Sequence, residues 1–249
     1  MELNKIYCMD NLKLLKQLND NCIDLIYCDI LYGTGRNFGD YKDIKANKYD
    51  VFIFYEERFK EMYRVLKNTG ILYIQCDQNI NHWIRILLDD IFGYDNFQRE
   101  IVWCYTSGGI SKTDFPKKHD YIIKYTKSKK YTYNPILKPY SEKTLNRGLT
   151  KCKNNYKLNN NGTPIVDWWN DITPLLSPTC YERVGYATQK PKELLDRIIK
   201  TSSNPNDIVA DFFCGSGTSM VVAKELGRRY IGCDINQKAV EITNRRLYE

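Results

Sequence analysis

The stretch Asp211-Phe-Phe-Cys-Gly-Ser-Gly-Thr218 decides the fold of this chain. Apolar residues at 208–210 predict a short buried strand before it, and the apolar residues after Thr218 predict a helix. Glycines at 215 and 217 allow a sharp turn between strand and helix, and they allow a ligand to approach the backbone closely. Strand, glycine turn and helix in this order indicate a Rossmann-like α/β fold.

The chemistry around this turn favours a cationic ligand. The third glycine of the dinucleotide fingerprint is absent because position 220 is Met. The acid Asp211 precedes the turn, and a carboxylate repels phosphate but attracts positive charge. The next predicted strand ends in Asp234, which is placed to accept two ribose hydroxyls. The alternative is a generic turn in which Asp211 caps the helix.

The rest of the chain alternates strands and helices around one irregular segment. This alternation predicts a mostly parallel sheet. Strands are expected at 22–29, 71–76, 99–104, 119–125, 208–213 and 229–234, and helices at 9–18, 55–68, 82–91, 191–202, 218–227 and 237–247.

The basic charge of the chain is concentrated in that irregular segment. Residues 104–180 hold 13 Lys and Arg against 5 Asp and Glu, a charge of +8, whereas the whole chain carries +7. The same segment contains ten aromatic residues. Basic charge mixed with aromatic rings suits a nucleic acid, and a solvated lysine-rich insertion is the alternative.

Composition excludes several other classes. No apolar run reaches the roughly 18 residues of a membrane span, and residues 1–7 lack a signal peptide pattern, so a cytoplasmic protein is expected. The nine cysteines form no Cys-x-x-Cys pair and there are two histidines, so we expect neither a metal site nor a disulfide framework.

A second motif, Asp29-Ile-Leu-Tyr32, ends the predicted strand 22–29. With the glycine turn it resembles the motifs of amino-group DNA methyltransferases, in the order typical of the permuted β class. The family pattern at the first motif is Asp, Asn or Ser, then Pro-Pro, then Tyr or Phe. This chain keeps the acid and the aromatic residue but has Ile30 and Leu31 in place of the prolines.

The resemblance implies a Rossmann-like fold that binds S-adenosyl-L-methionine, with a seven-stranded, mostly parallel sheet and a circularly permuted motif order. Residues 1–104 and 184–249 would form the catalytic α/β domain. Residues 105–183 would form an inserted, basic target-recognition region that binds double-stranded DNA, with Lys117, Lys118, Lys129 and Lys130 as DNA-binding residues.

The resemblance also implies a role for each motif residue. Asp29 and the Ile30 carbonyl would accept the two hydrogens of the target amine, and Tyr32 would stack on the extruded base, with Phe38 and Trp103 as neighbours. The cofactor residues would be Asp10, Asp29, Thr188, Gln189, Lys190, Asp211, Phe212, Phe213, Cys214, Gly215, Ser216, Gly217, Thr218 and Asp234. An N-cap of the first helix is the alternative for Asp10.

The expected activity is methylation of adenine N6 in a specific sequence, because Asp in the first motif position is typical of adenine enzymes. Cytosine-N4 methylation and a DNA-binding homologue without activity are the alternatives. A restriction–modification system or an orphan methylase would be the setting. A homodimer and a cognate restriction endonuclease are left open as partners.

Overall fold

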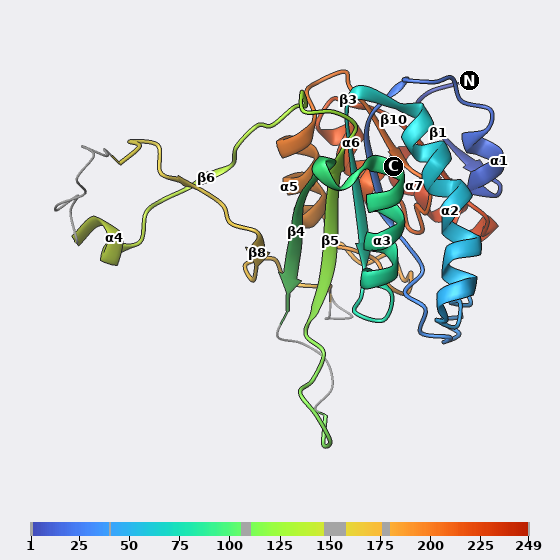
Figure 1. Ribbon diagram of the computed structural model, residues 1–249, viewed down its shortest axis with the longest axis horizontal. Coiled ribbons are helices and arrows are strands. Elements are labelled where there is room, and N and C mark those ends of the chain that lie inside the picture. The colour runs from blue at the N-terminus through green and yellow to red at the C-terminus, as the bar shows by residue number, and fades with distance from the viewer. Residues whose placement is uncertain (1, 40, 106–110, 147–157, 176–179, 249) are drawn as a thin grey trace.

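A computed structural model describes residues 2–39, 41–105, 111–146, 158–175 and 180–248. Within these residues, eight strands form one sheet that is covered by helices on both faces (Figure 1). Their order across the sheet is β1 (Lys5–Cys8), β10 (Arg229–Asp234), β9 (Ile208–Asp211), β2 (Ile23–Asp29), β3 (Leu66–Cys76), β5 (His119–Thr126), β4 (Phe97–Cys104) and β8 (Trp168–Trp169).

The expected mostly parallel sheet is confirmed. Every neighbouring pair is parallel except the two that involve β5, which runs antiparallel to β3 and to β4. Seven strands make up the expected sheet, and the two-residue β8 adds an eighth at the edge.

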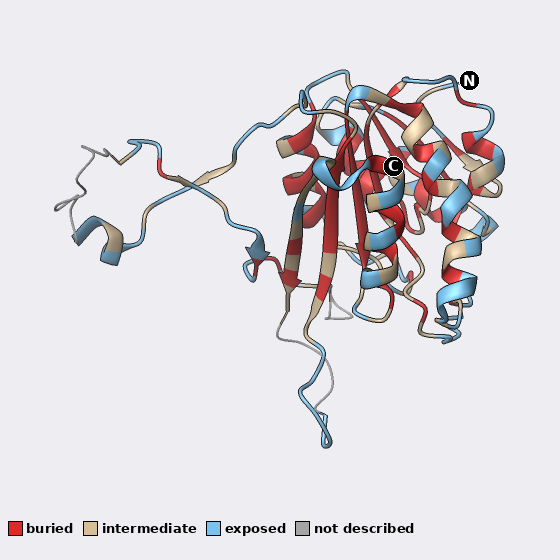
Figure 2. Ribbon diagram, in the orientation of Figure 1, coloured by how far each residue is buried: buried red, intermediate tan, exposed pale blue. Residues whose placement is uncertain are grey.

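Alternating side chains of the strands build two cores, one on each face of the sheet. In β2, Ile26 and Cys28 belong to one core, while Leu25 and Tyr27 belong to the other, as the period of two in a strand requires. Helices α1 (Asn11–Leu15), α2 (Lys48–Val65) and α3 (Asn81–Phe92) contribute to the first core, and α5 (Lys192–Ser202), α6 (Thr218–Glu225) and α7 (Gln237–Tyr248) to the second. Figure 2 shows the buried sheet between these two layers.

The helix expected at 55–68 is shifted in the structure. Helix α2 begins at Lys48, where the Asn47 side chain accepts a hydrogen bond from the Asp50 amide (2.9 Å). It ends at Val65, because Leu66 already pairs with Ile23 in the sheet. A bulge in the β2–β3 pairing absorbs residues 67–70, between the Ile23–Leu66 and Leu25–Ile71 pairs.

Strand β5 lies in the sheet although the sequence places it inside the inserted region. Pairing over such a separation in sequence is not visible in local patterns. The chain leaves the sheet again after β5 and forms an arm whose described residues are 131–146 and 158–167, with β6 (Leu137–Lys138), α4 (Glu142–Asn146) and β7 (Thr163–Pro164). Figure 1 shows this arm projecting away from the sheet before the chain returns at β8.

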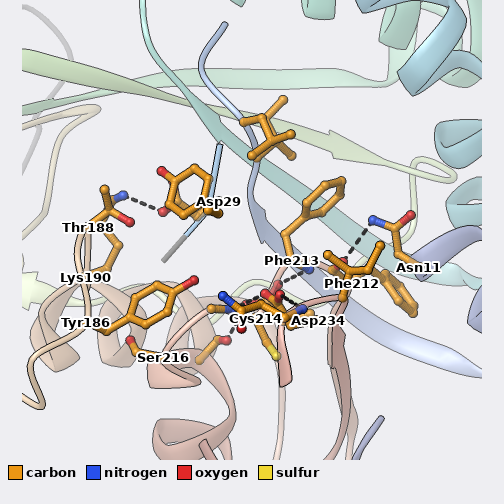
Figure 3. A pocket seen from close by; sticks show the side chains of 18 of the residues that line it. Asn11, Asp29, Tyr186, Thr188, Lys190, Phe212, Phe213, Cys214, Ser216 and Asp234 are labelled. Carbon is orange, nitrogen blue, oxygen red and sulfur yellow. Dashed lines mark hydrogen bonds and ion pairs between the residues drawn. The ribbon is translucent and has the colours of Figure 1, made fainter. Parts of the chain in front are cut away.

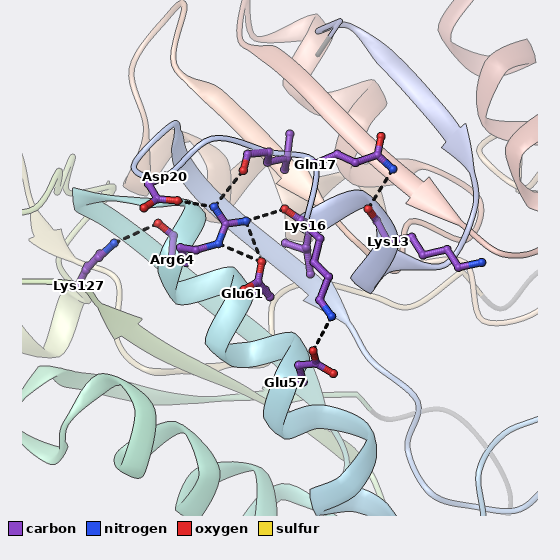
Figure 4. A network of polar contacts seen from close by, with 10 residues as sticks. Lys13, Lys16, Gln17, Asp20, Glu57, Glu61, Arg64 and Lys127 are labelled. Carbon is purple, nitrogen blue, oxygen red and sulfur yellow. Dashed lines mark hydrogen bonds and ion pairs between the residues drawn. The ribbon is translucent and has the colours of Figure 1, made fainter.

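A polar cluster around Arg64 ties α1 to α2 at the amino ends of β2 and β3 (Figure 4). The guanidinium donates to the carbonyl of Leu15 (2.8 Å), the last residue of α1, to that of Leu18 (2.9 Å) shortly after it, and to Glu61 (2.7 Å). Lys127 reaches the Arg64 carbonyl from the end of β5. The charged side chains at the amino ends of β2 and β3 therefore have structural partners.

The direction in which the chain moves across the sheet switches between β9 and β2, at the carboxyl ends of the parallel strands. From β9 the chain continues through α6 to β10 on one side, and from β2 it continues through α2 to β3 on the other. Ligands of open α/β sheets bind at the carboxyl ends of such adjacent strands. Among the described residues, no helix combines the length and apolarity needed to cross a bilayer.

Candidate active site

A cavity of about 480 Å³ lies at this switch point and is lined by both sequence motifs, a volume typical of small-molecule sites. Figure 3 shows Tyr186, Thr188 and Lys190 on the part of the chain before α5, with Phe212 and Phe213, which follow β9, and Asp234 at the end of β10 nearby. The predicted residues that line it are Asp10, Asp29, Ile30, Tyr32, Thr188, Lys190, Asp211, Phe212, Phe213, Cys214, Gly215, Ser216, Thr218 and Asp234.

The glycine turn is held from behind by α7. Gly217 has φ +73°, and a Cβ there would lie 2.2 Å from the Thr243 side chain, so this position requires glycine. Thr243 donates to the Gly215 carbonyl (3.1 Å), and Arg246 donates to the Ser216 carbonyl (2.6 Å). Gly217 therefore shapes the turn without lining the cavity.

Asp211 both organises the turn and faces the cavity. Its carboxylate accepts hydrogen bonds from the Phe213 amide (2.9 Å) and from the Ser219 hydroxyl at the start of α6. The N-cap of α6 is Gly217, without a side-chain cap hydrogen bond, so the alternative of Asp211 as the helix cap is wrong. Burial raises the pKa of Asp211 to about 7. Burial makes the ionised form of this carboxylate unfavourable, and a cationic ligand beside it would stabilise that form.

Asp234 ends β10 as expected. One carboxylate oxygen accepts from the Gly215 amide and the other from the Asn236 amide, both at 2.9 Å. Burial raises the pKa of Asp234. The carboxylate thus links the end of β10 to the glycine turn.

Asp10 is the N-cap of α1, where its Oδ1 accepts from the amides of Leu12 (3.0 Å) and Lys13 (3.2 Å). Its Oδ2 pairs with Arg58 at 2.8 Å, and the residue also lines the cavity. The structure therefore shows the capping role, and contact with a cofactor stays a prediction.

Asp29 is engaged by two partners at the end of β2. Its Oδ2 lies 2.5 Å from Lys190 Nζ, and its Oδ1 lies 2.8 Å from the Tyr32 hydroxyl oxygen. Burial raises the pKa of Asp29, and the Lys190 ammonium partly offsets that rise. The Lys190 ammonium also lies 5.2 Å from the centre of the Tyr32 ring.

The segment before α5 positions Lys190. Gln189 does not line the cavity: its side chain accepts from the Val184 amide (3.0 Å) and donates to the Glu182 carbonyl (2.7 Å), which closes the loop. Thr188 lines the cavity with φ +65°, an unusual conformation for a β-branched residue. Backbone strain of this kind concentrates at functional sites.

Four residues of the polar cluster behind Asp29 were missed by the sequence analysis: the buried Tyr27, Gln75 and Asp120, and the partly buried Tyr105. Asp120 lies on β5 and its Oδ2 is 2.9 Å from the Tyr32 hydroxyl. One signal was present, since Gln75 is a lone polar residue at the end of the apolar run 71–76. Asp120 could not be found, because its strand was assigned to the inserted region.

The structure places one of the two expected neighbours of Tyr32 at the cavity and the other in the core. Phe38 lines the cavity and stacks on Tyr41, with ring centres 5.1 Å apart. Trp103 is buried in the core, where its indole donates to the Ile172 carbonyl at 3.0 Å. Placing Trp103 beside the base was therefore wrong.

The four predicted DNA-binding lysines lie at opposite ends of β5. Lys117 and Lys118 precede the strand at the cavity edge, where Lys117 donates to Asn79 at 3.0 Å. Lys129 and Lys130 follow it at the other edge, where Lys129 contacts the Asp95 carbonyl. Eight strand residues at about 3.3 Å each separate the two pairs by roughly 25 Å, so they do not form one surface.

A family model described as DNA methylase, covering N6 and N4 enzymes, matches residues 23–245. The chain belongs to this family. A type II methyltransferase of Haemophilus parainfluenzae, M.HpaI, is 37% identical over 98% of this chain and 74% of its own length. The DNA adenine methyltransferase YhdJ of Escherichia coli (strain K12) is 35% identical over 96% of this chain and 80% of its own length.

Solved structures of DNA methyltransferases share the fold. The M1.HpyAVI–SAM complex matches with a TM-score of 0.65 and 21% identity, over 98% of this chain and 99% of that one. The cytosine-N4-specific PvuII DNA methyltransferase matches with a TM-score of 0.72 and 16% identity, over 100% of this chain and 88% of that one. At these identities the likeness shows that this methylase has the α/β fold of those enzymes.

Proposed function

We propose that this DNA methylase transfers a methyl group from S-adenosyl-L-methionine to adenine N6 in a specific DNA sequence. The observation that carries the proposal is that Asp29 and the glycine turn 211–218 line one cavity. An acceptor for the target amine and a binding turn for the methyl donor then meet at the same place. The motif order agrees with a permuted arrangement.

The cavity fits S-adenosylmethionine by the chemistry of its lining. Two carboxylates, the buried Asp211 and the partly buried Asp234, face a space that is also lined by Phe213 and Tyr186. A sulfonium and an ammonium are attracted by such carboxylates, and a purine and a sugar suit aromatic and acidic neighbours. When bound, the cofactor supplies a methyl group on a positively charged sulfur.

The residues of the chain position the amine for this transfer. An exocyclic amine is a poor nucleophile, because its lone pair is delocalised into the base. Asp29 Oδ1 and the Ile30 carbonyl would accept its two hydrogens and so expose the lone pair, while Tyr32 stacks on the base. The Ile30 amide donates to the Gln75 carbonyl at 3.1 Å, which fixes the backbone just before that carbonyl. Positioning of this kind accounts for much of the catalysis of a direct displacement.

Adenine is favoured over cytosine by the acid at position 29, and one relative at 35% identity is named an adenine enzyme. The same acceptor pair could serve a cytosine amine, and a structural neighbour is cytosine-N4-specific. Cytosine-N4 methylation is therefore the second candidate. By analogy with M.HpaI, a type II methyltransferase, we place the enzyme in a restriction–modification system with a cognate endonuclease as partner.

Nucleoside mass spectrometry of DNA treated with the purified protein and S-adenosylmethionine tests the proposal. N6-methyladenine is expected, and Asp29→Ala should lower turnover by at least ~10²-fold while DNA binding persists. N4-methylcytosine as the main product would replace the adenine assignment. Absence of both products, with cofactor and DNA each bound, would leave a DNA-binding protein without activity.

A further inference from the structure

A second carboxylate lies behind the motif residues. Asp120 is 5% exposed and stands on β5. Its Oδ1 accepts from the Tyr105 hydroxyl at 3.1 Å, and its Oδ2 accepts from Gln75 Nε2 at 2.9 Å. The Tyr32 hydroxyl lies 2.9 Å from Asp120 Oδ2 and 2.8 Å from Asp29 Oδ1. One phenol therefore bridges two carboxylates.

The hydrogens of this cluster can be counted. The Tyr27 hydroxyl donates to Gln75 Oε1 at 2.7 Å, so the Gln75 nitrogen faces Asp120 and the Tyr32 oxygen. Tyr32 has a single hydrogen and can donate it to only one of the two acids. Lys190 already balances the charge of Asp29, whereas Asp120 has no such cation among its contacts in the cluster. The Tyr32 hydrogen is therefore assigned to Asp120. The cluster can then take up one further proton between Asp29 and Tyr32.

Methylation of an amine releases one proton. The nitrogen–methyl bond forms as the methyl–sulfur bond breaks, the sulfur becomes neutral, and the positively charged nitrogen must lose a proton. Asp29 is the nearest acceptor in the proposed arrangement. Its side chain is 20% exposed, and it opens to the cavity that cofactor and base would fill. A proton left on Asp29 would also neutralise the carboxylate that pairs with Lys190.

We propose, on the basis of the proposed function, that Asp120 receives this proton through Tyr32. Asp29 takes the proton from the amine and passes it to the Tyr32 oxygen, while Tyr32 passes its own hydrogen to Asp120. The relay ends with Asp29 ionised again, Tyr32 neutral and Asp120 protonated. Asp120 is thus a positioning residue that acts through Tyr32 and does not touch the base.

The charges around the pair set the expected pH dependence. The titratable groups that interact with the two acids are Lys190, Tyr27, Tyr32, Tyr41, Tyr105, Cys28, Cys76, Asp77 and Asp211. Burial raises the pKa of the four tyrosines, so they stay protonated in ordinary assays. Burial also raises the pKa of Asp29, and the Asp120 charge adds to that rise.

The test is the single-turnover methylation rate as a function of pH. In Asp120→Asn the rate plateau should fall about 10²-fold, and the acidic limb should move to lower pH, because Asp29 loses a like-charged neighbour. Tyr32→Phe keeps the ring but removes the bridge and should lose at least tenfold in rate. The double variant should be no slower than the slower single variant, since the two residues act as one unit.

Tyr73→Phe is the matched control. Tyr73 lies on β3, and its buried hydroxyl pairs with Ser202 of α5 at 2.7 Å, outside the cluster. Both the methylation rate and the position of the acidic limb should therefore be those of the wild type. An acidic limb that stays in place in Asp120→Asn, or losses that add in the double variant, would overturn the relay. If Asp120→Asn does not fold, a Tyr32→Phe rate within twofold of wild type overturns it. A wild type that methylates no DNA refutes the proposed function instead.

Discussion

The Tyr55 hydroxyl of α2 donates a 3.1 Å hydrogen bond to the Leu31 carbonyl, at the position where the family pattern has its second proline. Tyr55 is fully buried, so this contact fixes the backbone between the two motif residues Asp29 and Tyr32. Asp43 holds the next residues, accepting from the Gly33 (3.2 Å) and Thr34 (2.7 Å) amides. Hydrogen bonds thus supply here the rigidity that prolines would supply.

Tyr55→Phe should therefore lower turnover more than it lowers cofactor affinity. The partly buried Leu31 carbonyl would lose its partner, which costs about 1 kcal/mol, and the Ile30 carbonyl would be less well positioned. We expect a fall of about tenfold in the single-turnover rate, with calorimetric affinity for S-adenosylmethionine within twofold of wild type. Adding Leu31→Pro should recover part of the rate. An unchanged rate in Tyr55→Phe would show that the motif is rigid without this contact.

Gly217→Ala should abolish cofactor binding through the shape of the turn. The new methyl group would lie 2.2 Å from the Thr243 side chain, and φ is +73°. Gly227→Ala is the matched control, because its φ of +72° gives similar backbone strain but no atom lies within 4 Å. Calorimetry should show binding lost in the first variant and kept in the second. Equal losses in both would assign the effect to backbone strain alone.

Asp211→Asn should stabilise the cofactor-free protein at pH 8 while it weakens cofactor binding. The folded pKa of about 7 lies above the unfolded value near 3.8, so stability from this group is complete below pH ~4 and is lost as the pH rises to ~7. Three pKa units correspond to about 4 kcal/mol as an order of magnitude. Asn can keep the contacts with Phe213 and Ser219.

Thermal unfolding at pH 4 and pH 8 checks this prediction. The stability of Asp211→Asn relative to wild type should rise between the two pH values, and calorimetry at pH 8 should show weaker binding of S-adenosylmethionine. A variant that is less stable than wild type at pH 8 would indicate that the carboxylate is ionised and favourable in the folded protein.

The sequence predicted the parts of the site that are continuous in the chain. The glycine turn, Asp234 and the Asp29–Tyr32 motif are local patterns at strand ends, so their meeting at one cavity follows from a parallel sheet. Asp120 could not be predicted, because β5 joins the sheet by long-range pairing with β3 and β4. The same pairing places Lys117 and Lys129 at opposite ends of β5, although both belong to the basic segment of the sequence.

Because the two lysine pairs lie at opposite ends of β5, their contributions to DNA binding can be compared by mutation. Lys117 and Lys118 lie at the cavity edge, and Lys129 and Lys130 lie at the far end of β5. If DNA approaches the cavity, replacing the first pair by Ser should weaken binding to all sequences and reduce the slope of log affinity against log salt by about 2, since each phosphate contact releases about one counterion. The second pair replaced by Ser removes the same charge and should leave the slope unchanged. Fluorescence anisotropy across a salt series measures both. Equal slope changes would mean that net charge alone attracts DNA, and a change confined to Lys129 and Lys130 would place the duplex at the amino ends of the strands, away from Asp29.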